Sequence, residues 1–132
     1  MERKVLPLRN QAQLFDEALA DRLDNLLPQL MKRQNISMWI VMNREYNEDP
    51  VYLSMVPALA RYARRLSCLI FYRTEDDHVT RYCLGNDRDF KGMYTVIPWA
   101  PPTDRMALLR ETIEKLDPSN IALDFCAENQ FA

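Results

Sequence analysis

The stretch Ser37-Met38-Trp39-Ile40-Val41-Met42-Asn43 is a nearly continuous apolar run, and it decides the fold class. Successive side chains of a strand point to opposite faces of a sheet, so a run without alternation is typical of a central strand covered on both faces. A helical pattern precedes this run. The order helix then buried strand predicts an α/β fold with residues 37–43 as its first strand.

Upstream of this strand, apolar residues recur at helical spacing over about residues 11–34 and predict a long amphipathic helix that faces the sheet. Asn10 is a plausible N-cap and Asn35 a plausible stop, while Pro28 should bend the helix or divide it into two pieces. The apolar positions are Leu14, Phe15, Ala18, Leu19, Leu23, Leu26, Leu27, Leu30 and Met31.

Downstream of the first strand, a short helix is expected over residues 51–56, after Pro50, and two β-rich runs follow at residues 68–73 and 78–84. The four residues 74–77 between these runs predict a hairpin loop. If Arg73 lies opposite His78, Cys68 lies opposite Cys83. Close thiols do not imply a disulfide, and we expect them to be reduced.

The last third of the sequence predicts a strand at residues 94–99, a helix capped by Thr103, and a strand at residues 121–125. Pro98 favours a sheet edge for the first of these strands, and the helix should cross over to a neighbouring parallel strand. The whole chain, residues 1–132, is thus expected to form one three-layer α/β domain with a mixed sheet of about five strands.

The composition excludes several classes of partner. Seventeen basic against nineteen acidic residues give a net charge of −2, so no overall positive field favours nucleic acid or a membrane surface. The longest apolar run, Met38 to Met42, is too short to span a bilayer, and no signal-peptide pattern follows Met1. With only Gly85 and Gly92, a phosphate-binding loop is not expected either. We predict a cytoplasmic protein.

Residues suited to catalysis or metal binding are few. His78 is the single histidine, and it falls in the predicted hairpin turn beside Asp76 and Asp77, where we expect a solvated loop. Three widely spaced cysteines, Cys68, Cys83 and Cys126, fit no zinc site. The sequence therefore predicts no catalytic residue, no metal ligand and no cofactor in this chain.

An independent hydrolase or nuclease that uses Asp87, Asp89 and Asp124 is the least favoured alternative. Such an enzyme needs a base or nucleophile, and a nuclease also needs an electropositive groove. The candidate basic residues form one short patch, which we interpret as a solvated segment. They are Arg61, Arg64 and Arg65, beside Tyr62.

The segment from Arg44 to Asp49 is the most informative polar stretch, because it follows the most buried strand directly. Side chains on a rigid strand end can be aimed at a ligand or a partner. A polar loop that pairs only with itself explains the same residues equally well.

Three segments resemble the start of creatinase and prolidase-type metallopeptidases, especially bacterial Xaa-Pro aminopeptidase-like members. The first runs from the helix end at residues 26–34 through the strand at residues 38–42 to Arg44-Glu45-Tyr46-Asn47-Glu48-Asp49-Pro50-Val51. The other two are Leu69-Ile70-Phe71-Tyr72-Arg73 and Asn120-Ile121-Ala122-Leu123-Asp124. The resemblance covers most of the chain. One departure is Met55 after Tyr52-Leu53-Ser54, where the family commonly has glycine, and it leaves the substrate class open.

This resemblance implies a ribonuclease H-like N-terminal domain that is itself non-catalytic. It also implies a following pita-bread catalytic domain with two divalent metal ions, absent from this chain, and we expect the chain to be part of a longer protein. The expected partners are that domain and a second subunit, in a homodimer. Arg44, Glu45, Tyr46 and Asn47 would form an interface or wall the substrate entrance. The alternative is a module that binds a small molecule or protein, from a parent that has lost peptidase activity.

Overall fold

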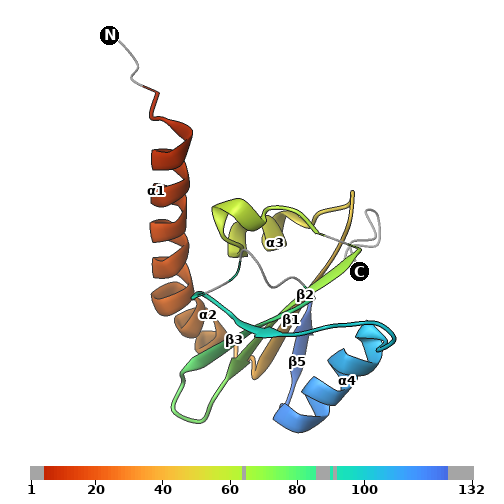
Figure 1. Cartoon of the computed structure of the whole chain (residues 1–132). Coiled ribbons are helices and arrows are strands. Elements are labelled where there is room, and N and C mark those ends of the chain that lie inside the picture. Colours follow the sequence, from red (N-terminus) through yellow and green to blue (C-terminus); the bar gives the residue numbers. More distant parts are fainter. Residues whose placement is uncertain (1–4, 64, 86–89, 91, 125–132) are drawn as a thin grey trace.

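Five strands form one mixed sheet in the order β4-β3-β2-β1-β5, and helices lie on both of its faces (Figure 1). This computed structural model describes residues 5–63, 65–85, 90 and 92–124. The predicted three-layer α/β class and the five-stranded mixed sheet are confirmed. The strands are β1 (Met38–Arg44), β2 (Leu66–Arg73), β3 (Val79–Leu84), β4 (Thr95–Ile97) and β5 (Ile121–Leu123).

The apolar run over residues 37–43 becomes β1, an interior strand, as predicted. Val41 packs in the core on one face of the sheet, whereas Met38 and Ile40 pack in the core on the other face. Both faces of the strand are therefore buried, which explains why its sequence lacks alternation. β1 is antiparallel to β2 and parallel to β5.

One face of the sheet is covered by α1 (Leu8–Asp21), a π-helical segment η1 (Arg22–Leu26), α2 (Leu27–Arg33) and α3 (Pro50–Met55). A 3₁₀ turn η2 (Ala58–Ala60) follows α3. In Figure 1, α1 extends well beyond the sheet. Leu19, Leu23, Leu27 and Met31 form the buried stripe, but Leu14, Leu26 and Leu30 of the predicted stripe are exposed.

The predicted division of the long N-terminal helix near Pro28 is confirmed, because the π-helical segment η1 separates α1 from α2, although the backbone stays helical throughout. The wider π turn of η1 directly precedes this proline, and the Leu27 amide donates to the Arg22 carbonyl five residues back. A π turn relieves the requirement for i to i−4 bonding that proline violates. The helix also begins earlier than predicted, at Leu8 after Pro7, so Asn10 is not its cap.

The hairpin between β2 and β3 is confirmed, but its predicted register was wrong. Arg73 lies opposite Val79, and Cys68 lies opposite Leu84 instead of Cys83. The Thr74 amide donates to the His78 carbonyl at 2.8 Å and closes a loop one residue longer than predicted. One residue of slip sends neighbouring side chains to opposite faces, so Cys68 and Cys83 pack in different cores.

The crossover prediction was also wrong about its destination. α4 (Arg105–Leu116) packs on the second face, and the chain then enters β5, which pairs with β1 and not with β4. β4 and β5 are the two edges of the sheet, so the edge position inferred from Pro98 is confirmed. The cap of α4 is Asp104, whose carboxylate accepts the Met106 amide at 3.1 Å, in place of Thr103.

Candidate functional site

The chain leaves β1 through a tight turn that projects one aromatic side chain into solvent. The Asn47 amide donates to the Arg44 carbonyl at 3.1 Å, and Tyr46 has the left-handed φ of 65°. Left-handed backbone is unfavourable for a residue with a Cβ, so it is held by its surroundings. Tyr46 is 91% exposed.

The start of β2 lies beside this turn and completes a hollow with it. Arg44 pairs with Leu66, and the Glu45 amide donates to the Arg65 carbonyl at 2.8 Å. In return, the Arg65 amide donates to the Glu45 carboxylate at 3.3 Å. The hollow is open, has a volume of about 410 Å³, and is lined by Arg44, Glu45, Tyr46, Arg65 and Leu66. We call these five residues the rim.

Arg44 and Arg65 give the rim two positive charges, against the one negative charge of Glu45. Within the described residues, neither the Arg44 nor the Arg65 guanidinium has a carboxylate oxygen within 4.0 Å. Arg105 lies close by: burial lowers the pKa of its guanidinium, and the charge of Arg65 lowers it further. Neighbouring cations raise the free energy of each other's charged form, and an anion bound at the rim would lower it.

Arg105 itself is fixed in place beneath the rim. Its Nη1 donates to the Leu66 carbonyl, and its Cζ lies 4.1 Å from the ring centroid of Trp99. Gly85 lies next to it, where a Cβ would make an ordinary contact 3.5 Å from the Arg105 Cζ, so it is the φ of 113° that favours glycine there. The rim is thus built where the paired ends of β1 and β2 meet a hydrogen-bonded turn.

Polar groups buried at this end of the sheet are incompletely paired. Asn43 Oδ1 accepts the Asp49 amide at 2.7 Å, but the Nδ2 of the same side chain has no partner among the described residues. Asp124 Oδ1 accepts the Trp39 Nε1–H at 2.9 Å, and its buried Oδ2 likewise has no partner there. Burial raises the pKa of Asp124, although the Trp39 bond opposes the shift, and Asp49 adds repulsion.

The structure brings together three of the four predicted site residues, Arg44, Glu45 and Tyr46, while Asn47 lies outside the hollow. Sequence reasoning missed Arg65 and Leu66 as members. The antiparallel pairing of β1 with β2 brings them there, and only its register reveals the convergence. Of the residues considered for other roles, Arg64, Asp87, Asp89 and Cys126 lie outside the described residues.

The hairpin turn holds no metal-like arrangement of side chains. Asp77 bonds Lys32 at 2.7 Å and Arg73 at 2.9 Å, and these hydrogen bonds, that of Lys32 first, lower its pKa. Asp76 accepts the Thr74 hydroxyl. Across the described part of the chain, no three or more His, Cys, Asp or Glu side chains are grouped so that they could hold a metal ion.

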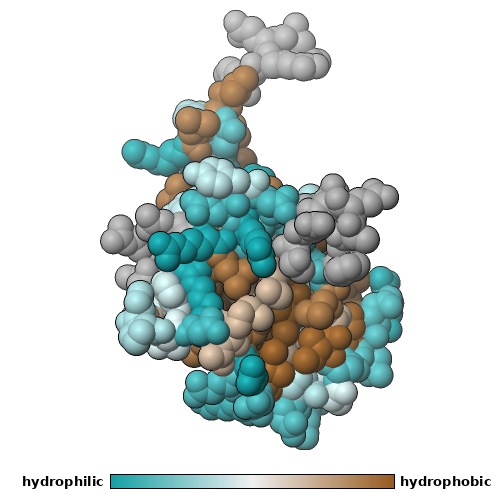
Figure 2. Space-filling model, turned by 90° about the vertical axis from the view of Figure 1, so that its right-hand side faces the viewer, coloured by the Kyte–Doolittle hydropathy of each residue, from teal (hydrophilic) through white to brown (hydrophobic). Residues whose placement is uncertain are grey.

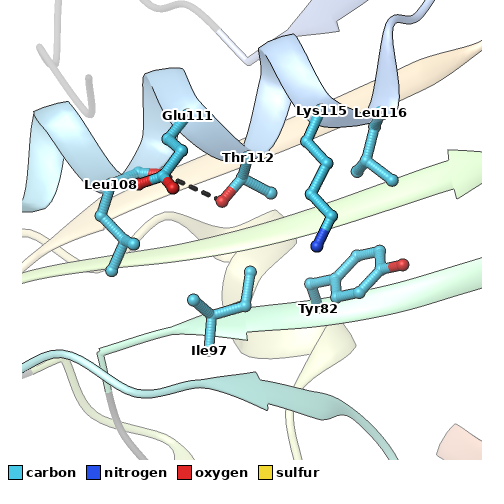
Figure 3. A pocket seen from close by; sticks show the side chains of 7 residues that line it. All are labelled: Tyr82, Ile97, Leu108, Glu111, Thr112, Lys115 and Leu116. Atoms are coloured by element: carbon cyan, nitrogen blue, oxygen red, sulfur yellow. Dashed lines mark hydrogen bonds between the residues drawn. The ribbon is translucent and has the colours of Figure 1, made fainter.

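A second hollow, of about 240 Å³, lies between α4 and the strands β3 and β4 (Figure 3). Its walls are mainly apolar, from Tyr82, Ile97, Leu108 and Leu116, and the Lys115 side chain points toward Tyr82. The hydroxyl of Thr112 is occupied, because it donates to the Leu108 carbonyl at 2.8 Å. Glu111 and Lys115 also line this hollow and bring one charge of each sign, whereas the rim has two guanidinium groups against one carboxylate, so the rim is the better candidate site for a charged ligand.

Hydrophobic side chains also reach the surface on the side of the molecule where α4 and β5 lie in Figure 1 (brown in Figure 2). On the edge strand β5, Ile121 is 43% and Leu123 is 62% exposed. Their neighbours on the same face of β1 are Met38 and Ile40, which are buried. α4 alone therefore does not cover this whole face.

In comparisons with known proteins, no protein-family model, no curated protein and no solved structure matches the chain. Among the helices of the described residues, none has the length and apolar character needed to cross a membrane.

Proposed function

We propose that this chain is the non-catalytic N-terminal domain of a metal-dependent, creatinase-like Xaa-Pro peptidase. In this proposal the rim walls the substrate entrance, and the domain packs against its own catalytic domain and a second subunit. Two divalent metal ions would belong to that catalytic domain. The observation that carries the proposal is the rim itself, a preorganised hollow in which Arg44, Glu45 and Tyr46 meet at the end of the interior strand β1.

The topology supports the ribonuclease H-like type that the resemblance implies. β1, β2 and β3 follow one another as an antiparallel meander, and a helix then leads to β5, which lies parallel to β1 on its free side. The short strand β4, parallel to β3 at the opposite edge, extends this arrangement.

The chemistry of the described residues supports a role in binding and not in bond cleavage. The single histidine, His78, lies in the exposed hairpin turn at the opposite end of the β1–β2 ladder from the rim. A hydrolytic site needs a base, nucleophile or metal near its oxyanion donors. The rim offers two guanidinium groups and an aromatic ring, which orient a ligand without reacting with it.

The test is a peptidase assay paired with the gene sequence beyond codon 132. The chain alone, supplied with Mn²⁺ or Co²⁺, should not cleave an Xaa-Pro peptide, whereas the longer protein should do so and should encode two Asp, one His and two Glu ligands in family order. Metal-stimulated cleavage by the 132 residues alone would overturn the proposal, as would a parent that lacks those ligands.

One observation favours a second candidate, a binding module from a parent without peptidase activity. The unneutralised arginines of the rim suit a ligand whether or not a catalytic domain follows. A downstream sequence without the five metal ligands would select this candidate over the peptidase.

A further inference from the structure

The two arginines of the rim, Arg44 and Arg65, form no ion pair within the described residues. Arg44 and Arg65 extend from neighbouring strand ends, and no carboxylate of the described residues lies within 4.0 Å of either guanidinium. Arg65 also repels Arg105, which is fixed beneath it. Folding therefore gathers three cations at one place, and within the described residues Arg44 and Arg65 form no ion pair with a carboxylate. An anionic group bound from outside would relieve this repulsion.

The backbone around these arginines is held in an unfavourable but rigid form. Tyr46 and Arg65 both adopt left-handed φ values, 65° and 61°. The Glu45 and Arg65 main chains are bonded to each other at 2.8 Å. Strained residues persist where the surrounding structure fixes them, and they are concentrated at binding sites. A preorganised site loses less conformational entropy when its ligand binds.

The remaining lining identifies the kind of anion. Glu45 adds one negative charge to the hollow, which disfavours polyanions such as phosphates and nucleic acid. Tyr46 is 91% exposed and Leu66 lies beside it, so the hollow offers an apolar wall as well as charge. Planar guanidinium groups match carboxylate oxygens in a bidentate manner. A carboxylate on an extended chain with apolar neighbours fits all three features.

We propose that the rim binds a carboxylate group of a peptide, with Arg44 and Arg65 as its ligands and Tyr46 packed against the peptide chain. This inference rests on the proposed role of the rim at a substrate entrance, and it adds that the rim selects peptides that carry a carboxylate. The carboxylate can come from an acidic side chain or from the C-terminus of the peptide, and the two sources are separable by experiment.

The experiment follows amide chemical shifts of the 132-residue chain by NMR during titration with three pentapeptides. One has blocked ends and two glutamates, one is alanine-only with a free C-terminus, and one has blocked ends and two glutamines. We expect at least one carboxylate peptide to shift residues 44–46 and 65–66 and to bind at least about tenfold more tightly than the glutamine peptide. The stronger of the first two identifies the source.

Variants then assign the charge to particular side chains. Arg44→Gln and Arg65→Gln should each weaken binding about tenfold, because each removes a charge-assisted contact. The matched control is Arg110→Gln, an exposed arginine of α4 outside the hollow, which should leave binding unchanged. If a rim variant does not fold, added NaCl gives a second measurement on the unaltered protein, since screening should weaken the complex.

Several outcomes would overturn the inference. These are equal binding of the glutamine peptide, equal loss in the Arg110→Gln control, shifts elsewhere than the rim, or tighter binding of inorganic phosphate than of either carboxylate peptide. Failure here is distinguishable from failure of the peptidase proposal. Carboxylate binding can stand while the downstream metal ligands are missing, and the ligands can be present while the rim ignores carboxylates.

Discussion

The two ends of the β1–β2 ladder use arginine in opposite ways. At the hairpin end, Arg73 donates from Nε to the Ile36 carbonyl at 2.9 Å, from Nη1 to Asp77 at 2.9 Å and from Nη2 to Asn35 at 3.4 Å. At the rim end, Arg44 and Arg65 have no carboxylate within 4.0 Å among the described residues. The charge at the hairpin end holds the fold, and the charge at the rim end is the one that we propose binds a carboxylate.

The same contrast holds for polar side chains other than arginine. At the hairpin end, Asn120 bonds the Ser37 amide through Oδ1 at 2.8 Å and the Asn35 carbonyl through Nδ2 at 2.9 Å. At the rim end, buried atoms of Asn43 and Asp124 lack partners in the described structure. Buried polar groups are nearly always paired, so unpaired ones concentrated at one end of a sheet indicate where selection favours function over stability. The comparison can be tested by substitution.

The largest effect is expected from Arg73→Met. The variant leaves the Ile36 carbonyl and Asp77 without their donor, and charge-assisted bonds of this kind contribute about 2 to 3 kcal/mol to the free energy of unfolding. Urea denaturation followed by circular dichroism measures the loss. A loss below about 0.5 kcal/mol would show that the hairpin-end arginine is not structural and would remove the contrast.

Asn120→Ala is expected to have the next largest effect. It removes the two side-chain bonds from Asn120 to the chain before β1, and we expect a loss of about 1 to 2 kcal/mol in the free energy of unfolding. Asn10→Ala is a suitable control, since Asn10 is exposed and is not the helix cap. Hydrogen exchange should be faster at the Ser37 amide in the Asn120 variant and unchanged in the control.

The part of this contrast that depends on neighbouring residues could be predicted from the sequence. The part that depends on residues far apart in the sequence could not. The unbroken apolar run of β1 and the polar segment after it are local signals, and they located the central strand and three members of the rim. Arg65 joins them across 20 residues of sequence through strand register, which no local pattern specifies. The hairpin register failed for a similar reason, because a single Thr74 to His78 bond decides the loop length.

The place of β5 shows the same limit at the level of topology. Its short apolar sequence is suited to either free edge of a four-stranded sheet, so the pattern predicts a strand without its neighbour. In the structure β5 lies against β1, where Asp124 reaches Trp39 at 2.9 Å. That position puts a carboxylate at the end of the sheet that also carries the rim, which sequence reasoning had considered only as part of a nuclease-like cluster.

Asp124→Asn should have a smaller effect, and one of opposite sign. The pKa of Asp124 is raised in the folded protein, so folding favours the protonated carboxyl group. This contribution to stability is fully present below the unfolded pKa of about 4, and it is lost as the pH rises through the folded pKa. At pH 7 the variant keeps an acceptor for Trp39 and should be as stable as the unaltered protein or up to about 1 kcal/mol more stable.

The measurement for Asp124 is the difference in urea midpoint between variant and unaltered protein at several pH values. This difference should shrink or reverse below about pH 4, where the carboxyl is protonated in both folded and unfolded states. Asp77→Asn is the counterpart at the hairpin end, and the pH dependence of its effect on stability has the opposite sign. Its pKa is lowered in the fold, so its contribution is present above the unfolded pKa and is lost as the pH falls.

The smallest effect on stability, and the most informative, is expected for Arg65→Gln. The variant removes a charge that repels Arg105 and has no carboxylate within 4.0 Å among the described residues, so the free energy of unfolding should change by no more than about 0.5 kcal/mol. Urea denaturation at low and high NaCl measures it, and any gain should be larger at low salt, where the repulsion is less screened. A loss comparable to that of Arg73→Met would show that Arg65 is structural. The two ends of the sheet would then be alike, and the rim would have no charge reserved for a ligand.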